Sequence, residues 1–281
     1  MSTSALFGIK TALALAVLAI GLFGALLPWA LGARGLSDRP LALGDTFAGG
    51  VLGGAGLVHL LSDGIDRFRA ALPAVGYPLA LLLAGAGFLM ILLIEGVVVA
   101  GREEVHVPGV PADRAAGARH EVGWLPGTGE EHRPTHPLVL LIVLSAHSVI
   151  LGLALGAQGA VAGALVVFLA IVAHKAVAGF ALGMGYRRAG FARNRAAPQV
   201  AFFAAMTPLG ILAGSLATVA LASHADQLFE AVFDSLGAGT FLYIATLDIL
   251  RTEFDGPEDR WRKWLAASLG FGLMALLAVW V

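Results

Sequence analysis

Cysteine is absent from this 281-residue chain, and charged residues make up only 13% of it. The lack of cysteine excludes disulfides, zinc–thiolate sites and cysteine nucleophiles together. Soluble domains carry about 25% charged residues. A chain that is so poor in charge and 58% hydrophobic therefore needs lipid to cover its surface.

Signatures of other functional classes are also missing. The net charge is -1 and no long basic run occurs, so we expect no nucleic-acid partner. No HExxH or GxSxG motif is present, and no Walker A motif, so neither an enzyme nor an ATP-driven pump is indicated.

Eight apolar runs are each long enough to cross a bilayer, which takes about 20 residues. We place these spans at 5–31, 41–62, 75–99, 137–157, 160–183, 198–222, 232–250 and 264–281. The first run is too long for the core of a signal peptide. Segment 101–136 is polar and lacks apolar periodicity, so we predict a flexible loop within a single transmembrane domain, 1–281.

The basic residues predict an orientation. If the amino terminus is outside, the inner loops hold 14 of the 18 lysines and arginines and the outer segments hold three, Lys10, Arg67 and Arg69. This bias places both termini outside and the loop 101–136 in the cytoplasm. The inner set is Arg34, Arg39, Arg102, Arg114, Arg119, Arg133, Arg187, Arg188, Arg193, Arg195, Arg251, Arg260, Arg262 and Lys263.

Two internal similarities suggest how the spans are arranged. AGGVLGGAGL (48–57) resembles AGTFLYIATL (238–247), in spans that cross in opposite directions. The match is weak, but it is typical of inverted repeats of three helices, here 1–3 and 6–8. HSVILGLALG (147–156) resembles HKAVAGFALG (174–183) more closely, which sets spans four and five apart as a central hairpin.

His147 and His174 are nearly equidistant from the turn of that hairpin, near Ala160. Both should therefore lie ~20 Å from the turn, near the middle of the membrane. Two converging imidazoles are suited to a divalent metal such as zinc. The alternative is that each histidine only hydrogen-bonds a neighbouring helix, but ionisable groups at this depth are usually functional.

Other polar residues in the spans leave two interpretations open. Lys175 is either an interhelical tether or a determinant of substrate choice. His59 and Asp63 lie on one face near the outer end of span two, where they suit an access site for metal or a solvated helix end.

Taken together, these segments resemble the ZIP (Zrt/Irt-like) family of metal-ion transporters. The resemblance covers nearly every span, and its motifs are FAGGVLGGAGLVHLLSD (47–63), YPLALLLAGAGFLMILLIE (77–95), HSVILGLALGA (147–157), HKAVAGFALG (174–183), TPLGILAG (207–214) and GAGTFLYIATLDIL (237–250). It implies an all-α membrane protein and movement of zinc, iron or manganese toward the cytoplasm.

By motif position, the resemblance implies metal ligands at His147 and His174 and an Asn-or-Ser ligand position at Ser148. His59 and Asp63 fall on the permeation path. Two positions depart from the family, because Leu151 and Ala178 stand where members usually have at least one Glu. Lys175 and Thr207 replace carboxylates of a second metal site, which we therefore do not expect.

The sequence thus predicts a divalent-metal transporter of the cytoplasmic (inner) membrane, with zinc as the first choice of substrate. Its expected partners are the metal ion and the lipid bilayer, and a homodimer is left open. The alternative function is a transport-inactive paralogue that acts as a membrane-embedded sensor or partner subunit.

Overall fold

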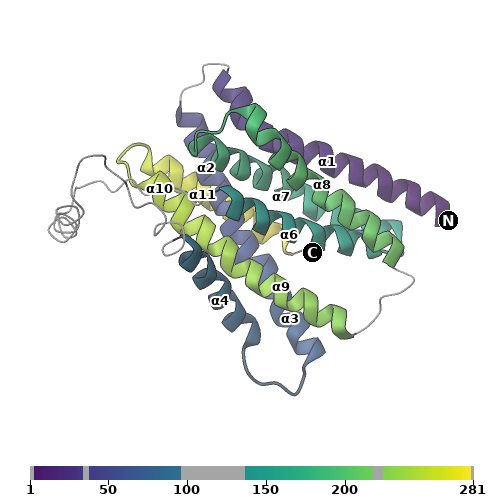
Figure 1. Cartoon of the computed structure of the whole chain (residues 1–281). Coiled ribbons are helices and arrows are strands. Elements are labelled where there is room, and N and C mark those ends of the chain that lie inside the picture. The colour runs from purple at the N-terminus through teal and green to yellow at the C-terminus, as the bar shows by residue number, and fades with distance from the viewer. Residues whose placement is uncertain (1–2, 34–37, 96–136, 218–223, 280–281) are drawn as a thin grey trace, which may run out of the picture.

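The computed structural model describes residues 3–33, 38–95, 137–217 and 224–279, which form eight helical rods (Figure 1). The predicted loop 101–136 lies outside the described residues. The rods are α1 (Thr3–Ala33); α2 (Asp38–Gly54) continued by η1 (Ala55–Leu60) and α3 (Leu61–Ala71); α4 (Leu79–Leu93); α6 (Pro137–Ala157); α7 (Val161–Arg188); α8 (Arg193–Ala217); α9 (His224–Tyr243) continued by η4 (Ile244–Leu250) and α10 (Arg251–Phe254); and α11 (Arg260–Leu277).

The distribution of side chains is that of a membrane protein. Six of the rods are long and apolar enough to cross a bilayer, and α4 is a shorter apolar helix. Large apolar side chains such as Leu15, Phe23 and Ile142 lie exposed on the outside, whereas Lys175 and Asp45 are buried inside. Lipid can cover an apolar exterior, and interior charges need protein partners. The chain is therefore a multi-pass helical membrane protein.

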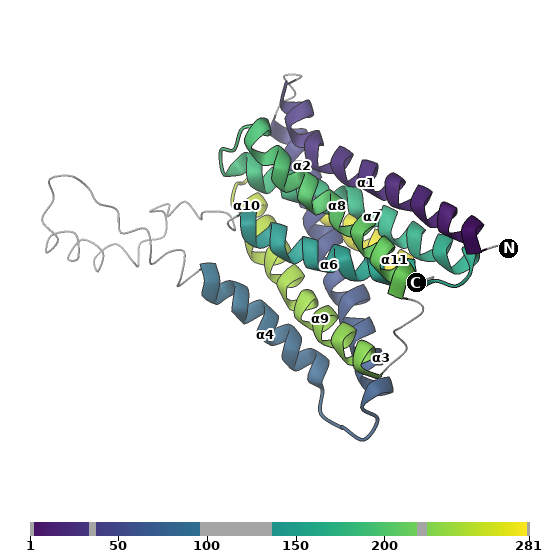
Figure 2. The same cartoon turned by 45° about the vertical axis from the view of Figure 1, so that its right-hand side comes forward.

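The helices pack as two bundles. In the first bundle, α6 lies along α8, and α1 lies along both α7 and α8. In the second bundle, α2 packs on α11, while α3 and α4 pack on α9. Figures 1 and 2 show these groups from two directions. The bundles meet mainly where α2 faces α7 and where α6 faces α9.

Small residues bring the helices of each bundle into backbone contact. A Cβ added at Gly24 of α1 would lie 2.0 Å from the carbonyl oxygen of Ala176 in α7. A Cβ added at Gly239 of α9 would lie 1.8 Å from the carbonyl oxygen of Ala84 in α4. Glycine at such positions permits the close helix approach that is common in membranes.

Among the described residues, complete π-helical turns occur in two rods, as η1 in the second and η4 in the seventh, and each continues an α-helix without a break. Ile94 and Glu95, which follow α4, also have π-helical geometry. The π-helix is rare and occurs mostly as short interruptions, often at functional sites. His59 lies in η1, and Asp248 lies in η4.

Side-chain contacts identify the two ends of the molecule. The Arg39–Asp259 ion pair joins the start of α2 to the start of α11, and the hydrogen bond from Arg39 lowers the pKa of Asp259. Arg187 and Arg188 lie in the last turn of α7 at this same end of the molecule, which we call the arginine-rich end. At the opposite end, Lys10 Nζ donates over 2.5 Å to the carbonyl oxygen of Gly156, which lies in the last turn of α6, where carbonyls lack partners within the helix.

Candidate metal site

His147 of α6 and His174 of α7 meet inside the protein, as their equal distance from the hairpin turn predicts. Their ring centroids are 5.9 Å apart, and their exposed fractions are 8% and 5%. The His147 ring also packs edge-on against Phe241 of α9. Its Nε2 atom is buried and has no hydrogen-bond partner among the described residues. A buried nitrogen of this kind is costly unless it binds something.

His59 reaches the same place from the second bundle. Its ring centroid lies 6.3 Å from that of His174. Its Nδ1 atom lies 3.3 Å from Oδ2 of Asp63, one turn further along the rod, and Asp63 is partly exposed. A carboxylate in this position can fix the orientation of an imidazole, as it does around many metal-binding histidines. The His174 imidazole therefore lies next to both of the others where the two bundles meet.

The rings are slightly too far apart to bind one ion without movement. Two imidazoles on one tetrahedral zinc, with Zn–N bonds of about 2.0–2.1 Å, have centroids about 5 Å apart. The observed separations are 5.9 Å and 6.3 Å. Among the residues that the structure describes, no three His, Cys, Asp or Glu side chains yet form a metal-binding group. Each of these two ring pairs would have to close by about 1 Å to reach that separation.

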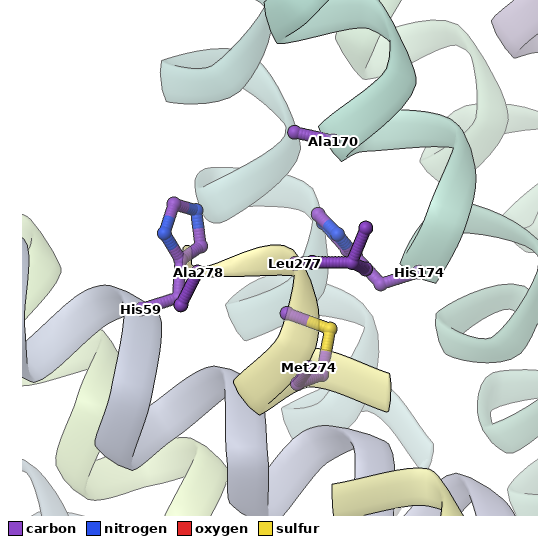
Figure 3. A pocket seen from close by; sticks show the side chains of 6 residues that line it. All are labelled: His59, Ala170, His174, Met274, Leu277 and Ala278. Carbon is purple, nitrogen blue, oxygen red and sulfur yellow. The ribbon is translucent and has the colours of Figure 1, made fainter. Parts of the chain in front are cut away.

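A small cavity separates His59 from His174 (Figure 3). Its volume is about 10 Å³, close to the space that one water molecule needs. Figure 3 shows the two imidazoles on opposite walls, with the Met274 side chain of α11 below the gap between them. The lining residues are His59, Ala170, His174, Met274, Leu277 and Ala278.

Lys175 lies beside the histidines in a shell of neutral oxygens. Its Nζ atom donates to Ser148 Oγ over 2.8 Å and to Thr207 Oγ1 over 3.1 Å. It also approaches the Phe203 carbonyl oxygen at 3.4 Å and lies 3.7 Å from the centre of the Phe203 ring. These contacts join α7 to α6 and α8, as the tether interpretation requires. The hydroxyl oxygen of Ser148, which the sequence predicts as a metal ligand, therefore already accepts a hydrogen bond from the Lys175 ammonium group.

Comparison with known proteins identifies the family of this chain. The family model described as "ZIP Zinc transporter" matches residues 127–278. Mouse zinc transporter ZIP2 is 30% identical over 98% of this chain and 99% of its own length. Human zinc transporter ZIP2 is 29% identical with the same coverage, and mouse zinc transporter ZIP1 is 32% identical over 84% of this chain and 78% of its own length. The chain belongs to the ZIP family.

ZIP proteins are membrane transporters and not enzymes, which agrees with the missing catalytic motifs. This ZIP chain has apolar residues at two positions near its histidines. Leu151 is half-buried against an apolar cluster that includes Val17 of α1 and Ile211 of α8. Ala178 is buried in the main core. Neither residue lines the small cavity between His59 and His174.

One group in this ZIP chain was not predicted from the sequence. Arg188 of α7 forms ion pairs with Asp45 of α2 and with Glu253 of α10, and Lys263 Nζ lies 3.1 Å from Glu253 Oε2. The Asp45 side chain is 1% exposed. Arg188 and Glu253 also line a cavity of about 310 Å³ at the arginine-rich end. Asp45 was detectable in principle, because a carboxylate inside an apolar span is a functional candidate.

Proposed function

We propose that this protein carries zinc across the membrane toward the cytoplasm, and that His59, His147 and His174 bind the ion on its way. The supporting observation is that the buried His174 imidazole lies beside both the buried His147 imidazole and the largely buried His59 imidazole, where the two bundles meet. Neutral imidazole is a common zinc ligand. Relatives that cover nearly the whole chain are named zinc transporters. Iron and manganese are the alternative substrates.

The position of the site supports a transport role. His147 and His174 belong to the first bundle, and His59 belongs to the second. A shift of one bundle against the other would change the ring separations and the access to the site from each side. Transporters built from repeated helical units work by this kind of movement around a central site.

The orientation of the path follows from charge. We place the arginine-rich end in the cytoplasm and both termini outside, because positive residues favour the cytoplasmic side. The cavity of about 310 Å³ beside Arg188 then lies on the exit side. At the opposite end, Asp63 is half-exposed and in contact with His59, so it suits the access side.

The inverted repeat gains support from the π-helical turns. The similarity of 48–57 to 238–247 pairs residues that are 190 positions apart, so the segment Ala55–Leu60 corresponds to 245–250. The two π-helical turns occupy Ala55–Leu60 and Ile244–Leu250. A rare interruption at matching positions is expected if the two rods descend from one unit, and corresponding irregular helices mark binding sites in such transporters.

Lys175 gives the site a fixed cation. Lys175 follows His174 directly in the chain, and its ammonium group donates hydrogen bonds to Ser148 and Thr207. A second metal ion at this place would meet like charge in a medium of low dielectric constant. We therefore propose one ion per transport cycle, with Ser148 able to act as a ligand only if Lys175 moves away.

The second candidate function is a transport-inactive paralogue that serves as a sensor or partner subunit. Leu151 and Ala178 favour it, because the site has no carboxylate from either position to offset the dehydration of a divalent ion. Zinc uptake by the purified protein in liposomes separates the two functions. Transport predicts saturable uptake above that of empty liposomes, and the paralogue predicts none from a folded protein.

A further inference from the structure

One of the side chains that line the cavity between His59 and His174 carries a sulfur atom. This residue is Met274 of α11, which is 3% exposed. Figure 3 shows its thioether directed into the space between the two rings, rather than away from it. The other side chains of the lining are Ala170, Leu277 and Ala278, which have no donor atoms.

Met274 is held in this place by the packing of its helix. Gly54 lies next to it, and a Cβ added at Gly54 would come within 2.8 Å of the Met274 Cβ. α11 lies along α2, the helix that continues into η1 and His59. The thioether and the His59 imidazole therefore belong to the same bundle and would move together.

We infer that Met274 is a metal ligand of the transport site and that its sulfur favours soft and borderline divalent ions, such as cadmium and zinc, over manganese. This inference rests on the proposed function of the histidine site. Thioethers select softer metals, and imidazoles suit zinc, whereas manganese prefers carboxylates, carbonyls and water. All these donors are neutral, so the site does little to offset the dehydration of a hard ion.

The absence of cysteine makes this inference unusually easy to test. Any sulfur bonded to the ion must come from a methionine, because the chain has no cysteine. X-ray absorption spectroscopy of the full chain in detergent, loaded with zinc and then with cadmium, reports nitrogen and sulfur neighbours separately. We expect both kinds of neighbour in the unmodified protein.

The variant Met274→Leu assigns the sulfur. Leucine keeps the volume and the apolar character of methionine, so the core should tolerate it. The sulfur signal should disappear and the nitrogen signal should remain. Cadmium affinity should fall by about tenfold or more, as it does when support for a metal site is removed. Manganese affinity should change little.

Met184→Leu is the matched control, because Met184 is also buried, at 5% exposure, and lies on α7. It should retain the sulfur signal. If Met274→Leu does not fold, leucine at Met90, Met184 and Met206 together leaves Met274 and the amino-terminal Met1 as the remaining sources of sulfur. Loss of the sulfur signal in that variant would contradict the inference.

Two further results would overturn the inference. The first would leave the proposed histidine site intact, and the second would remove that site as well. Nitrogen neighbours without sulfur in the unmodified protein would show that Met274 is not a ligand, while the histidine site would stand. An ion with no imidazole nitrogen around it would remove both the inference and the proposed function.

Discussion

Removing Arg188 should destabilise the protein through the buried carboxylate that it leaves behind. Asp45 is 1% exposed and pairs with Arg188, which also pairs with Glu253. Glu253 has a second cationic partner in Lys263 at 3.1 Å. Loss of the guanidinium would therefore destabilise the buried carboxylate of Asp45 more than the carboxylate of Glu253.

The size of the effect follows from burial. Breaking a buried ion pair by removing one partner costs about 3–5 kcal/mol, because the remaining charge has no compensation. We expect Arg188→Met to lose stability on this scale. The double variant Arg188→Met with Asp45→Asn should recover most of the loss, because it removes the stranded charge as well.

The measurement is the thermal stability of each purified variant in the same detergent. Arg69→Met is the control, because the Arg69–Asp66 pair is 3.5 Å apart with side chains 78% and 74% exposed. Exposed pairs of this kind contribute little. The reasoning is refuted if Arg188→Met is as stable as Arg69→Met, or if the double variant is no more stable than Arg188→Met.

Two predictions concern orientation and the missing carboxylates. Gly127→Cys lies in the predicted cytoplasmic loop, outside the described residues, and would be the only cysteine of the chain. It should resist an impermeant thiol reagent in intact cells and react once the membrane is opened, because we place this loop in the cytoplasm. Labelling in intact cells would reverse the predicted topology. Leu151→Glu should tighten zinc binding by about tenfold, because it would add an anionic carboxylate to a set of neutral ligands and so help to offset the dehydration of the ion. Lower thermal stability without a gain in zinc affinity would show that position 151 serves only the apolar core.

The sequence predicted best those features that depend on the pattern of residues within one segment or within two neighbouring segments. Apolar runs of sufficient length predicted helices that the structure contains in every described span. The matched spacing of His147 and His174 from one turn predicted their contact, because two antiparallel helices with a short connection have a fixed register. The family was also identified from motifs, and the comparisons confirm it.

The remaining features depend on contacts between distant segments. Met274 looks like an ordinary core residue in its own helix, and only the packing of α11 on α2 brings it near His59. The division into two bundles depends on which glycines face which helices, and a list of spans does not contain that information. The partners of Lys175 come from α6 and α8, so its surroundings could not be deduced from the HK dipeptide alone.

The central claim is that His59, His147 and His174 act as one site. Zinc uptake into liposomes should be measured for each alanine variant, for the pairs and for the triple variant, with folding checked by thermal stability. Residues that act as a unit have non-additive effects. We predict that each single variant loses most of the uptake and that the combinations are little worse. Independent losses that multiply across the three positions, or full uptake in any single variant, would contradict the claim.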